Sequence, residues 1–308
     1  MVAMKIEFFG VRGSIPRPLS TQELLGRLLL KAKDGAIKTS TLKTMAKTGG
    51  LGYGANTSCV YIEQENEHII IDAGTGLRAL GEKLIKTPVD QPINLLLTHL
   101  HWDHIQGLPF FAPIYQKGRT VKVYSAIPKD SLEKAFIDQW CSPYFPVPYK
   151  ALLSNIEYHH FNKSLEVGPF KVDAILMAHP DPTYGYKVSS QGKSYAHFSD
   201  TELSILDPKM SKKYKSFLSG VDLLVTDSQF DVEDAQKFAG WGHSSIIAFI
   251  DLLKDENIKT MAIFHHNPQT DESYVDQIFK DAKKHLKKVI PGGSTKLICA
   301  IEGQSMTL

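Results

Sequence analysis

The stretch PINLLLTHLHWDH, residues 92–104, is the most informative part of this sequence. It begins as a short apolar run, typical of a buried strand, and then places His99, His101, Asp103 and His104 within six positions. Residues two apart in extended backbone share a face, so His99 and His101 can bind one ion together, while the next turn presents Asp103 and His104 to a neighbour. Imidazoles and carboxylates bind zinc-class ions, and grouping four of them beside a buried strand is costly unless they are coordinated. The stretch therefore predicts a metal site.

The composition is that of a globular protein without a strong charge field. The chain has 308 residues, of which 43% are hydrophobic, and its 35 basic and 33 acidic residues give a net charge of +2. This balance provides no strong nucleic-acid footprint and no attraction to a membrane surface. The three cysteines are far apart, and no apolar segment is long enough for a secretory leader or a membrane span. We expect a cytoplasmic protein without a membrane partner.

Alternating and helical patterns organise the rest of the chain into one layered α/β domain. Strands are expected at 4–10, 58–64, 68–74, 92–99, 120–126, 170–179, 183–190, 194–200, 221–228, 259–266 and 295–303. Helices are expected at 76–86, 130–140, 243–256 and 271–288. Two stretches have the composition of inserts, the lysine-rich residues at about 17–50 and the proline- and aromatic-rich residues at about 138–161. Either could form a wall or a lid over a site.

The motif HLHWDH at residues 99–104 resembles the H-x-H-x-D-H signature of the metallo-β-lactamase-fold hydrolases. The resemblance extends over nearly the whole chain, from FFGVRGSIP at residues 8–16 to FHHNP at residues 264–268. It implies that residues 1–308 form a single α/β domain, an αββα sandwich of two mixed β-sheets flanked by helices. It also implies that metals bind at one edge, where the loops at the strand ends converge.

The resemblance implies two metal sites whose ligands come from several strand ends. The first site would use His99, His101 and His179, and the second would use Asp103, His104 and His265, with Asp200 bridging the two. The three distant ligands each end an apolar run in the sequence, which supports the assignment independently. His266 competes with His265, because alternation along a strand lets only one of the pair face the metals.

Asp72, in IIIDAGTG, matches an aspartate that supports a ligand or a loop in this family. A turn-forming aspartate before Gly74 is the alternative interpretation.

The motif GWGHSS at residues 240–245 indicates which reaction the metals serve. It resembles the G-H-x-[ST] motif of the tRNA 3′-processing nuclease and phosphodiesterase branch, in which the histidine faces the scissile phosphodiester. A histidine that titrates near neutral pH can protonate a leaving alkoxide. The alternative is that His243 only packs near Trp241 at the start of a helix.

We therefore expect a dinuclear metal-dependent phosphodiesterase that hydrolyses a small phosphodiester, with a cyclic nucleotide as one candidate. A hydroxide formed on the metals would attack phosphorus, with His243 as general acid and Asp103 as the other catalytic residue. The expected cofactors are two divalent metal ions, Zn²⁺ by default, with Mn²⁺ or Fe²⁺ as alternatives.

Three alternatives remain open at this point. The same metals could hydrolyse a carboxylic ester, lactone or thioester; the chain could be an RNA 3′-end nuclease; or it could be a non-catalytic, metal-stabilised sensory domain. RNA is disfavoured because no glycine- and proline-rich basic arm is present. Substrate-binding residues and oligomeric state are not specified by the sequence, and a homodimer is an open alternative.

Several other residues carry two interpretations each. Arg12 could contact phosphate or serve as a loop arginine. The lysines from Lys31 to Lys47 could hold a nucleotide or form a solvated face. Tyr144, Phe145 and Tyr149 could stack on a base or pack within the protein.

Overall fold

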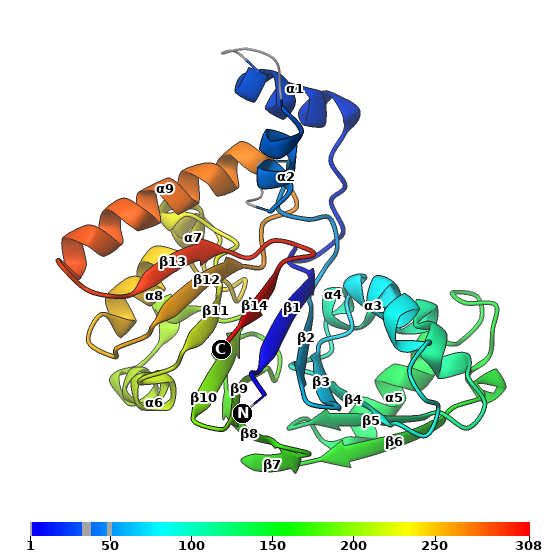
Figure 1. Cartoon of the computed structure of the whole chain (residues 1–308). Helices are drawn as coiled ribbons and strands as arrows, with labels where there is room; N and C mark the ends of the chain where they lie inside the picture. The colour runs from blue at the N-terminus through cyan, green and yellow to red at the C-terminus, as the bar shows by residue number, and fades with distance from the viewer. Residues whose placement is uncertain (1, 33–37, 48–50) are drawn as a thin grey trace.

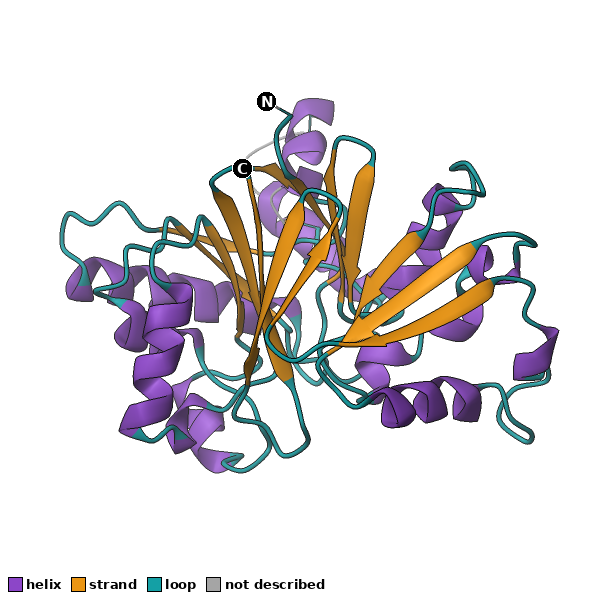
Figure 2. Ribbon diagram, turned by 90° about the horizontal axis from the view of Figure 1, so that it is seen from below, coloured by secondary structure: helices purple, strands orange, loops and turns teal. Residues whose placement is uncertain are grey.

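Two seven-stranded mixed sheets face each other, and helices cover their outer faces (Figures 1 and 2). The computed structural model describes residues 2–32, 38–47 and 51–308. The architecture confirms the αββα sandwich that the sequence predicted. The lysine run from Lys31 to Lys47 lies partly outside the described residues.

The first sheet carries the strand that precedes the H-x-H-x-D-H motif. Its order is β14 (Ser305–Thr307), β1 (Lys5–Gly10), β2 (Cys59–Gln64), β3 (Glu67–Ile71), β4 (Ile93–Leu96), β5 (Thr120–Ser125) and β6 (Asn155–His160). Pairing is antiparallel from β14 to β3 and parallel from β3 to β6. The sequence did not predict β6, whose NIEYHH lacks a clear apolar alternation, so the proposed insert at 138–161 ends in an edge strand.

The second sheet repeats this plan. Its order is β13 (Lys296–Cys299), β12 (Thr260–Phe264), β11 (Leu223–Asp227), β10 (Lys193–Phe198), β9 (Tyr184–Ser190), β8 (Phe170–Leu176) and β7 (Ser164–Val167). Pairing is antiparallel from β7 to β10 and parallel from β10 to β13. Because β8 and β10 both run antiparallel to β9, the carboxyl ends of β8, β10, β11 and β12 lie at the same edge.

Helices cover the outer face of each sheet. Residues of α3 (Gly76–Leu84), α4 (Trp102–Ile105) and α5 (Lys129–Gln139) pack with the first sheet. Those of α6 (Pro208–Leu218), α8 (Ile246–Leu253) and α9 (Glu272–Val289) pack with the second. The side-chain oxygens of Asp207, Ser245 and Asp271 cap α6, α8 and α9 by accepting backbone N–H groups. Shorter elements are α7 (Val232–Lys237) and the 3₁₀ turns η1 (Leu108–Phe110), η2 (Ala112–Tyr115), η3 (Tyr149–Ala151) and η4 (Leu203–Ile205).

The helices α1 (Thr21–Ala32) and α2 (Thr39–Lys47) project beyond the sheets, near the start of α9 (Figure 1). Arg27 of α1 pairs with Asp276 of α9 at 3.1 Å. Within the described ranges, no helix combines the length and the apolar character needed to cross a membrane.

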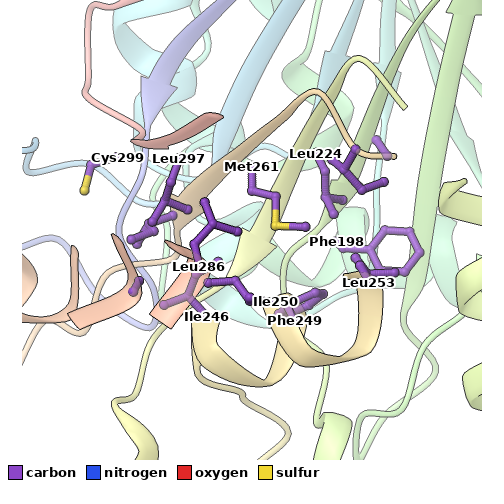
Figure 3. Packing of buried hydrophobic residues seen from close by; sticks show 14 of the residues in the cluster. Phe198, Leu224, Ile246, Phe249, Ile250, Leu253, Met261, Leu286, Leu297 and Cys299 are labelled. Carbon is purple, nitrogen blue, oxygen red and sulfur yellow. The ribbon is translucent and has the colours of Figure 1, made fainter. Parts of the chain in front are cut away.

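Apolar side chains fill the space between the sheets and the space beneath the helices. One cluster joins the facing surfaces of both sheets, including Phe8 of β1 and Phe264 of β12, whose ring centroids lie 6.1 Å apart. A second cluster joins α8 and α9 to the outer face of the second sheet, with Phe249 and Ile250 packed beside Met261 (Figure 3). Burying each such side chain contributes about 1.5–3 kcal/mol. The strand ends that carry the functional residues are therefore held by well-packed layers on both sides.

Candidate metal and active site

The strand ends bring all seven predicted ligands to one edge of the sandwich. His99, His101, Asp103 and His104 follow β4, His179 follows β8, Asp200 follows β10, and His265 follows β12. These side chains form two adjacent groups in which the ligand atoms of each group lie within 4.8 Å of one another.

The first group consists of His99, His101 and His179. The Nδ1 of His179 donates to the carbonyl of Gly242 at 3.0 Å, which leaves its Nε2 as a lone pair facing His101 Nδ1 at 3.3 Å. The buried Nε2 of His99 has no hydrogen-bond partner among the described residues. Burial, aided by the nearby His104, lowers the pKa of His99 well below its usual value. His99 therefore stays neutral, the form of imidazole that binds metals.

The second group consists of Asp103, His104, Asp200 and His265, all of them buried. His104 Nε2 lies 3.1 Å from Asp200 Oδ2 and 3.3 Å from both Asp103 Oδ2 and His265 Nε2. Asp200 Oδ1 lies 3.8 Å from His99 Nε2, so Asp200 stands between the two groups. An ion held by either group would therefore lie within reach of the Asp200 carboxylate.

The electrostatics of the second group call for a cation. Burial disfavours charge on His104, but the carboxylates of Asp200, Asp103 and Asp72 outweigh it and raise the pKa of this imidazole well above its usual value. Burial likewise opposes ionisation of Asp103 and Asp200, yet the surrounding imidazoles hold the pKa of both carboxyls well below the usual range. Buried carboxylates and imidazole lone pairs that face one another need a shared positive charge. A divalent metal ion fits this donor set.

Asp72 orients one member of this group. Its Oδ2 accepts a hydrogen bond from His104 Nδ1 at 2.7 Å, while its Oδ1 accepts from the backbone N–H of Thr98 at 2.9 Å. The bond to His104 directs the Nε2 lone pair toward the group, as carboxylates commonly do for ligating histidines. Asp72 also has a positive φ of 63°, so it forms the turn before Gly74 as well as supporting the imidazole.

His265 faces the site and His266 faces away from it. The Nε2 of His265 lies 3.2 Å from Asp103 Oδ2 and 3.3 Å from Asp200 Oδ1. His266 instead donates through Nε2 to the carbonyl of Ala300 at 3.1 Å. A Cβ on Gly13 would come within 2.5 Å of the His265 ring, so the first loop needs glycine to approach this closely.

The same loop places Ser14, whose backbone N–H donates to Asp103 Oδ2 at 2.7 Å. A main-chain contact of this kind leaves no signal in the sequence.

Arg12 does not line the site, and the interpretation of this residue as a phosphate contact is wrong. Its side chain is fully buried, where Nε donates to the carbonyl of Gly54 at 2.7 Å and the guanidinium pairs with Glu272. Glu272 opens α9 and also accepts the backbone N–H of Tyr53 at 3.1 Å. Arg12 therefore joins the first loop to α9, which explains its presence in the loop without any role for a substrate.

His243 lies beside the second group with a carboxylate behind it. Its Nδ1 donates to Asp227 Oδ2 at 2.9 Å, and its ring stacks on that of His265 with centroids 5.2 Å apart. Asp227 ends β11 and is fully buried, where it also accepts the backbone N–H groups of Thr201 and Gln229. Trp241 does not hold the His243 ring in place. The contacts of the ring are with Asp227, Phe230 and the neighbouring imidazoles of His179 and His265.

The Asp227 partnership raises the proton affinity of His243. Burial by itself would lower the pKa of this imidazole, but the charge and hydrogen bond of Asp227, followed by Asp200 and Asp103, outweigh burial and raise the pKa to about 9. The sequence interpretation missed Asp227, although it ends the apolar run VDLLVTD much as Asp200 closes SYAHFSD. A cavity of about 230 Å³ opens beside His243 and is lined by Trp241, Ile15 and Asn267, among others.

Known proteins resemble this chain in sequence and in fold. Residues 67–266 match the family model described as a Beta-lactamase superfamily domain. Ribonuclease Z from Prochlorococcus marinus subsp. pastoris is 24% identical over 288 residues, covering 75% of this chain and 88% of that protein.

Solved structures share the fold over the whole chain. The metallo-beta-lactamase fold protein YhfI from Bacillus subtilis is 15% identical, with a TM-score of 0.65 and coverage of 100% of both chains. Unliganded yeast PDE1 is 14% identical, with a TM-score of 0.67 and the same coverage.

Proposed function

Because this chain belongs to the β-lactamase superfamily and is a metal-dependent hydrolase, we propose that it is a phosphodiesterase that cleaves a small phosphodiester, with His243 as general acid. The observation that carries this proposal is the pair of His243 and Asp227, which stands beside the ligand groups with His243 Nδ1 donating to Asp227 Oδ2 at 2.9 Å. A thioesterase, whose leaving group is a stable thiolate, has less need of such a proton donor.

We assign the two groups to two metal ions, zinc by default. His99, His101 and His179 would hold the first ion, and Asp103, His104 and His265 the second, with Asp200 between them. When bound, such ions lower the pKa of water and stabilise negative charge on phosphoryl oxygens. Asp72 keeps the His104 lone pair directed inward, and the Ser14 amide fixes the carboxylate of Asp103. These contacts hold the donor atoms in place before any substrate arrives.

His243 is suited to deliver a proton on the side of the 230 Å³ cavity. With Nδ1 committed to Asp227, the imidazolium offers its Nε2 proton to the leaving oxygen of a diester. Both Asp227 oxygens are already engaged by backbone N–H groups as well as by His243, so Asp227 acts as a fixed support for the imidazolium. The third set of donor atoms within 4.8 Å, Asp227, His243 and His265, is explained by this pairing.

The test compares leaving groups in a His243→Asn variant. A diester that releases an alkoxide needs a proton, whereas one that releases p-nitrophenolate does not. We expect the variant to retain its metals and to lose about 100- to 10,000-fold in turnover on the alkoxide diester, with a far smaller loss on the p-nitrophenyl diester. Asp200→Asn should instead lose bound metal, measured by elemental analysis.

Three outcomes would contradict the proposal. His243→Asn could lose its metals, which would make the residue a ligand. Its turnover could fall by the same factor on both diesters, which would show that His243 does not act as the general acid. The wild-type enzyme could hydrolyse thioesters or lactones better than phosphodiesters, in which case the metals serve carboxylic ester chemistry and His243 is dispensable.

RNA 3′-end cleavage is the second candidate function. The relative described above is a ribonuclease Z and is similar to 75% of this chain. That similarity gives no support to the expectation, drawn from the balanced charge, that nucleic acid is disfavoured as a partner. The discriminating measurement is kcat/KM for a 3′-extended RNA against a small diester at two ionic strengths, because an RNA footprint of several phosphates makes binding steeply salt-dependent.

A further inference from the structure

A second, larger cavity borders the segment that carries the H-x-H-x-D-H motif. It has a volume of about 560 Å³, and its lining includes Leu100 and Trp102, the chain neighbours of His101. Its other walls come from η1, the end of α5 and the stretch around Tyr144. Residues of α4 and α5 pack against the same outer face of the first sheet (Figure 1). Leu100 and Trp102 flank the candidate ligand His101 in the chain, so the cavity borders the segment that supplies the metal-binding side chains, and it shares no wall residue with the cavity beside His243.

Aromatic rings from three separate segments line this cavity and remain exposed. Trp102 is 76% exposed, Phe110 60% and Tyr144 80%. Phe145, also in the wall, packs edge-on against Phe110 with ring centroids 5.8 Å apart. Exposed apolar surface is costly in a monomer, and several large rings gathered around one hollow mark a binding site.

The wall chemistry favours an uncharged flat group. Asp138 is the only charged side chain among the described residues that line the cavity, and it pairs with Lys134. A phosphate would meet no positive charge here. Gln106 and Gln139 also line the cavity, and their amide groups can form hydrogen bonds with the polar edge of a ring. A volume of about 560 Å³ is within the range of small-molecule sites.

We infer that this cavity binds a nucleobase on the substituent of the phosphodiester that does not leave. The inference rests on the proposed function, which places the leaving group beside His243, in a separate cavity. The base stacks on the exposed rings of Phe110 and Tyr144 while the phosphoryl group lies at the metal-binding groups. The substrate class is thus a nucleotide diester. Tyr149, which the sequence also offered for stacking, does not line this cavity, and its ring packs edge-on against Trp140 with centroids 6.0 Å apart.

The test uses two substrates that share p-nitrophenolate as leaving group. Thymidine 5′-(p-nitrophenyl phosphate) carries a base, and methyl p-nitrophenyl phosphate does not. For Phe110→Ala and Tyr144→Ala we expect kcat/KM on the thymidine substrate to fall about 5- to 150-fold, mainly through KM, with the methyl substrate unchanged. Tyr144→Phe should restore the thymidine substrate. Leu153→Ala, an exposed apolar residue of the same stretch outside the cavity, is the matched control and should change neither.

A binding measurement tests whether the cavity holds a base, independently of turnover. Calorimetric titration of the metal-loaded protein with thymidine 5′-monophosphate should show the same loss of affinity in the two alanine variants. The inference is overturned if both variants bind and cleave as the wild type does, or if Trp241→Ala, beside His243, is the variant that loses the base preference. If the wild type cleaves neither diester, the proposed phosphodiesterase function is wrong. The cavity inference is then judged by binding alone, and it is wrong if thymidine 5′-monophosphate binds the wild type and the two alanine variants with equal affinity.

Discussion

The replacement Asp227→Asn tests how this protein holds a proton on His243. Asp227 is fully buried and accepts three hydrogen bonds, from Thr201 N at 3.0 Å, Gln229 N at 3.1 Å and His243 Nδ1 at 2.9 Å. Asparagine matches the aspartate in shape but supplies one acceptor oxygen and no charge. We expect the metals to stay bound, because Asp227 lies outside the two ligand groups.

The size of the effect follows from the pKa of His243. Asp227 is the largest of the charges that raise this pKa to about 9 against the opposing effect of burial. Bound metals would neutralise Asp103 and Asp200 in the wild type and in the variant alike, so the pKa of His243 then depends mainly on Asp227 and should fall when the charge and hydrogen bond of Asp227 are removed. The fraction of His243 that is protonated at about pH 7.5 should therefore be smaller in the variant than in the wild type. We therefore expect kcat on an alkoxide diester to fall at least about 10-fold, and up to about 1,000-fold if the ring also loses its orientation.

The assay is the pH profile of kcat/KM on a diester with an alkoxide leaving group, recorded between about pH 5 and pH 10. A general acid is active while protonated, so the rate of each protein should decline as pH rises through the pKa of His243, and this decline should begin at lower pH in the variant than in the wild type. Asp251→Asn is the matched control, since the exposed Asp251 bonds the partly buried His285 at 2.6 Å and neither residue belongs to the candidate ligand groups. An unchanged alkaline limb in Asp227→Asn, with metals retained, would refute the reasoning.

Three further predictions concern metal affinity and stability. Asp72→Asn should weaken metal binding about 10- to 100-fold in a competitive chelator titration, and an unchanged affinity would show that the carboxylate does not orient a ligand. Arg12→Leu removes the main ion-pair partner of the buried Glu272 carboxylate, which keeps only the Tyr53 N–H and the more distant Arg17, and should lower the free energy of unfolding by about 3 kcal/mol in urea. Arg78→Leu, which breaks an exposed pair, should cost less than about 1 kcal/mol, and equal losses would contradict this account. Burial lowers the pKa of His68 to about 4, so its contribution to stability is complete above about pH 6.5 and is lost as pH falls toward 4. The loss should reach about 3 kcal/mol in denaturant titrations, and His68→Phe should flatten that slope, whereas an identical slope would exclude the histidine as its source.

The sequence predicted most of the core strands because they are apolar runs that stop at a polar residue. Strands β4, β10, β11 and β12 were all found in this way. The elements that were missed lack such a signal: β14 has three residues, and α6 reads PKMSKKYKSFL, in which lysines hide the apolar face that Tyr214 and Leu218 bury. Asp227 was missed for a different reason. It carries the same strand-end signal as Asp200, but no motif pointed to it.

Local pattern and chain direction determined which side chains gather at the site. Histidines and carboxylates placed directly after apolar runs must emerge at strand ends, and parallel strands bring their carboxyl ends to one edge. The seven candidate ligands were named from the resemblance to the family's motif, and the apolar runs that precede His179, Asp200 and His265 supported that assignment. Only the tertiary structure decided what surrounds each of them, because that depends on contacts between residues far apart in the chain. Asp72 behind His104 is 32 positions away, Asp227 behind His243 is 16 positions away, and Glu272 takes Arg12 out of the site across 260 positions.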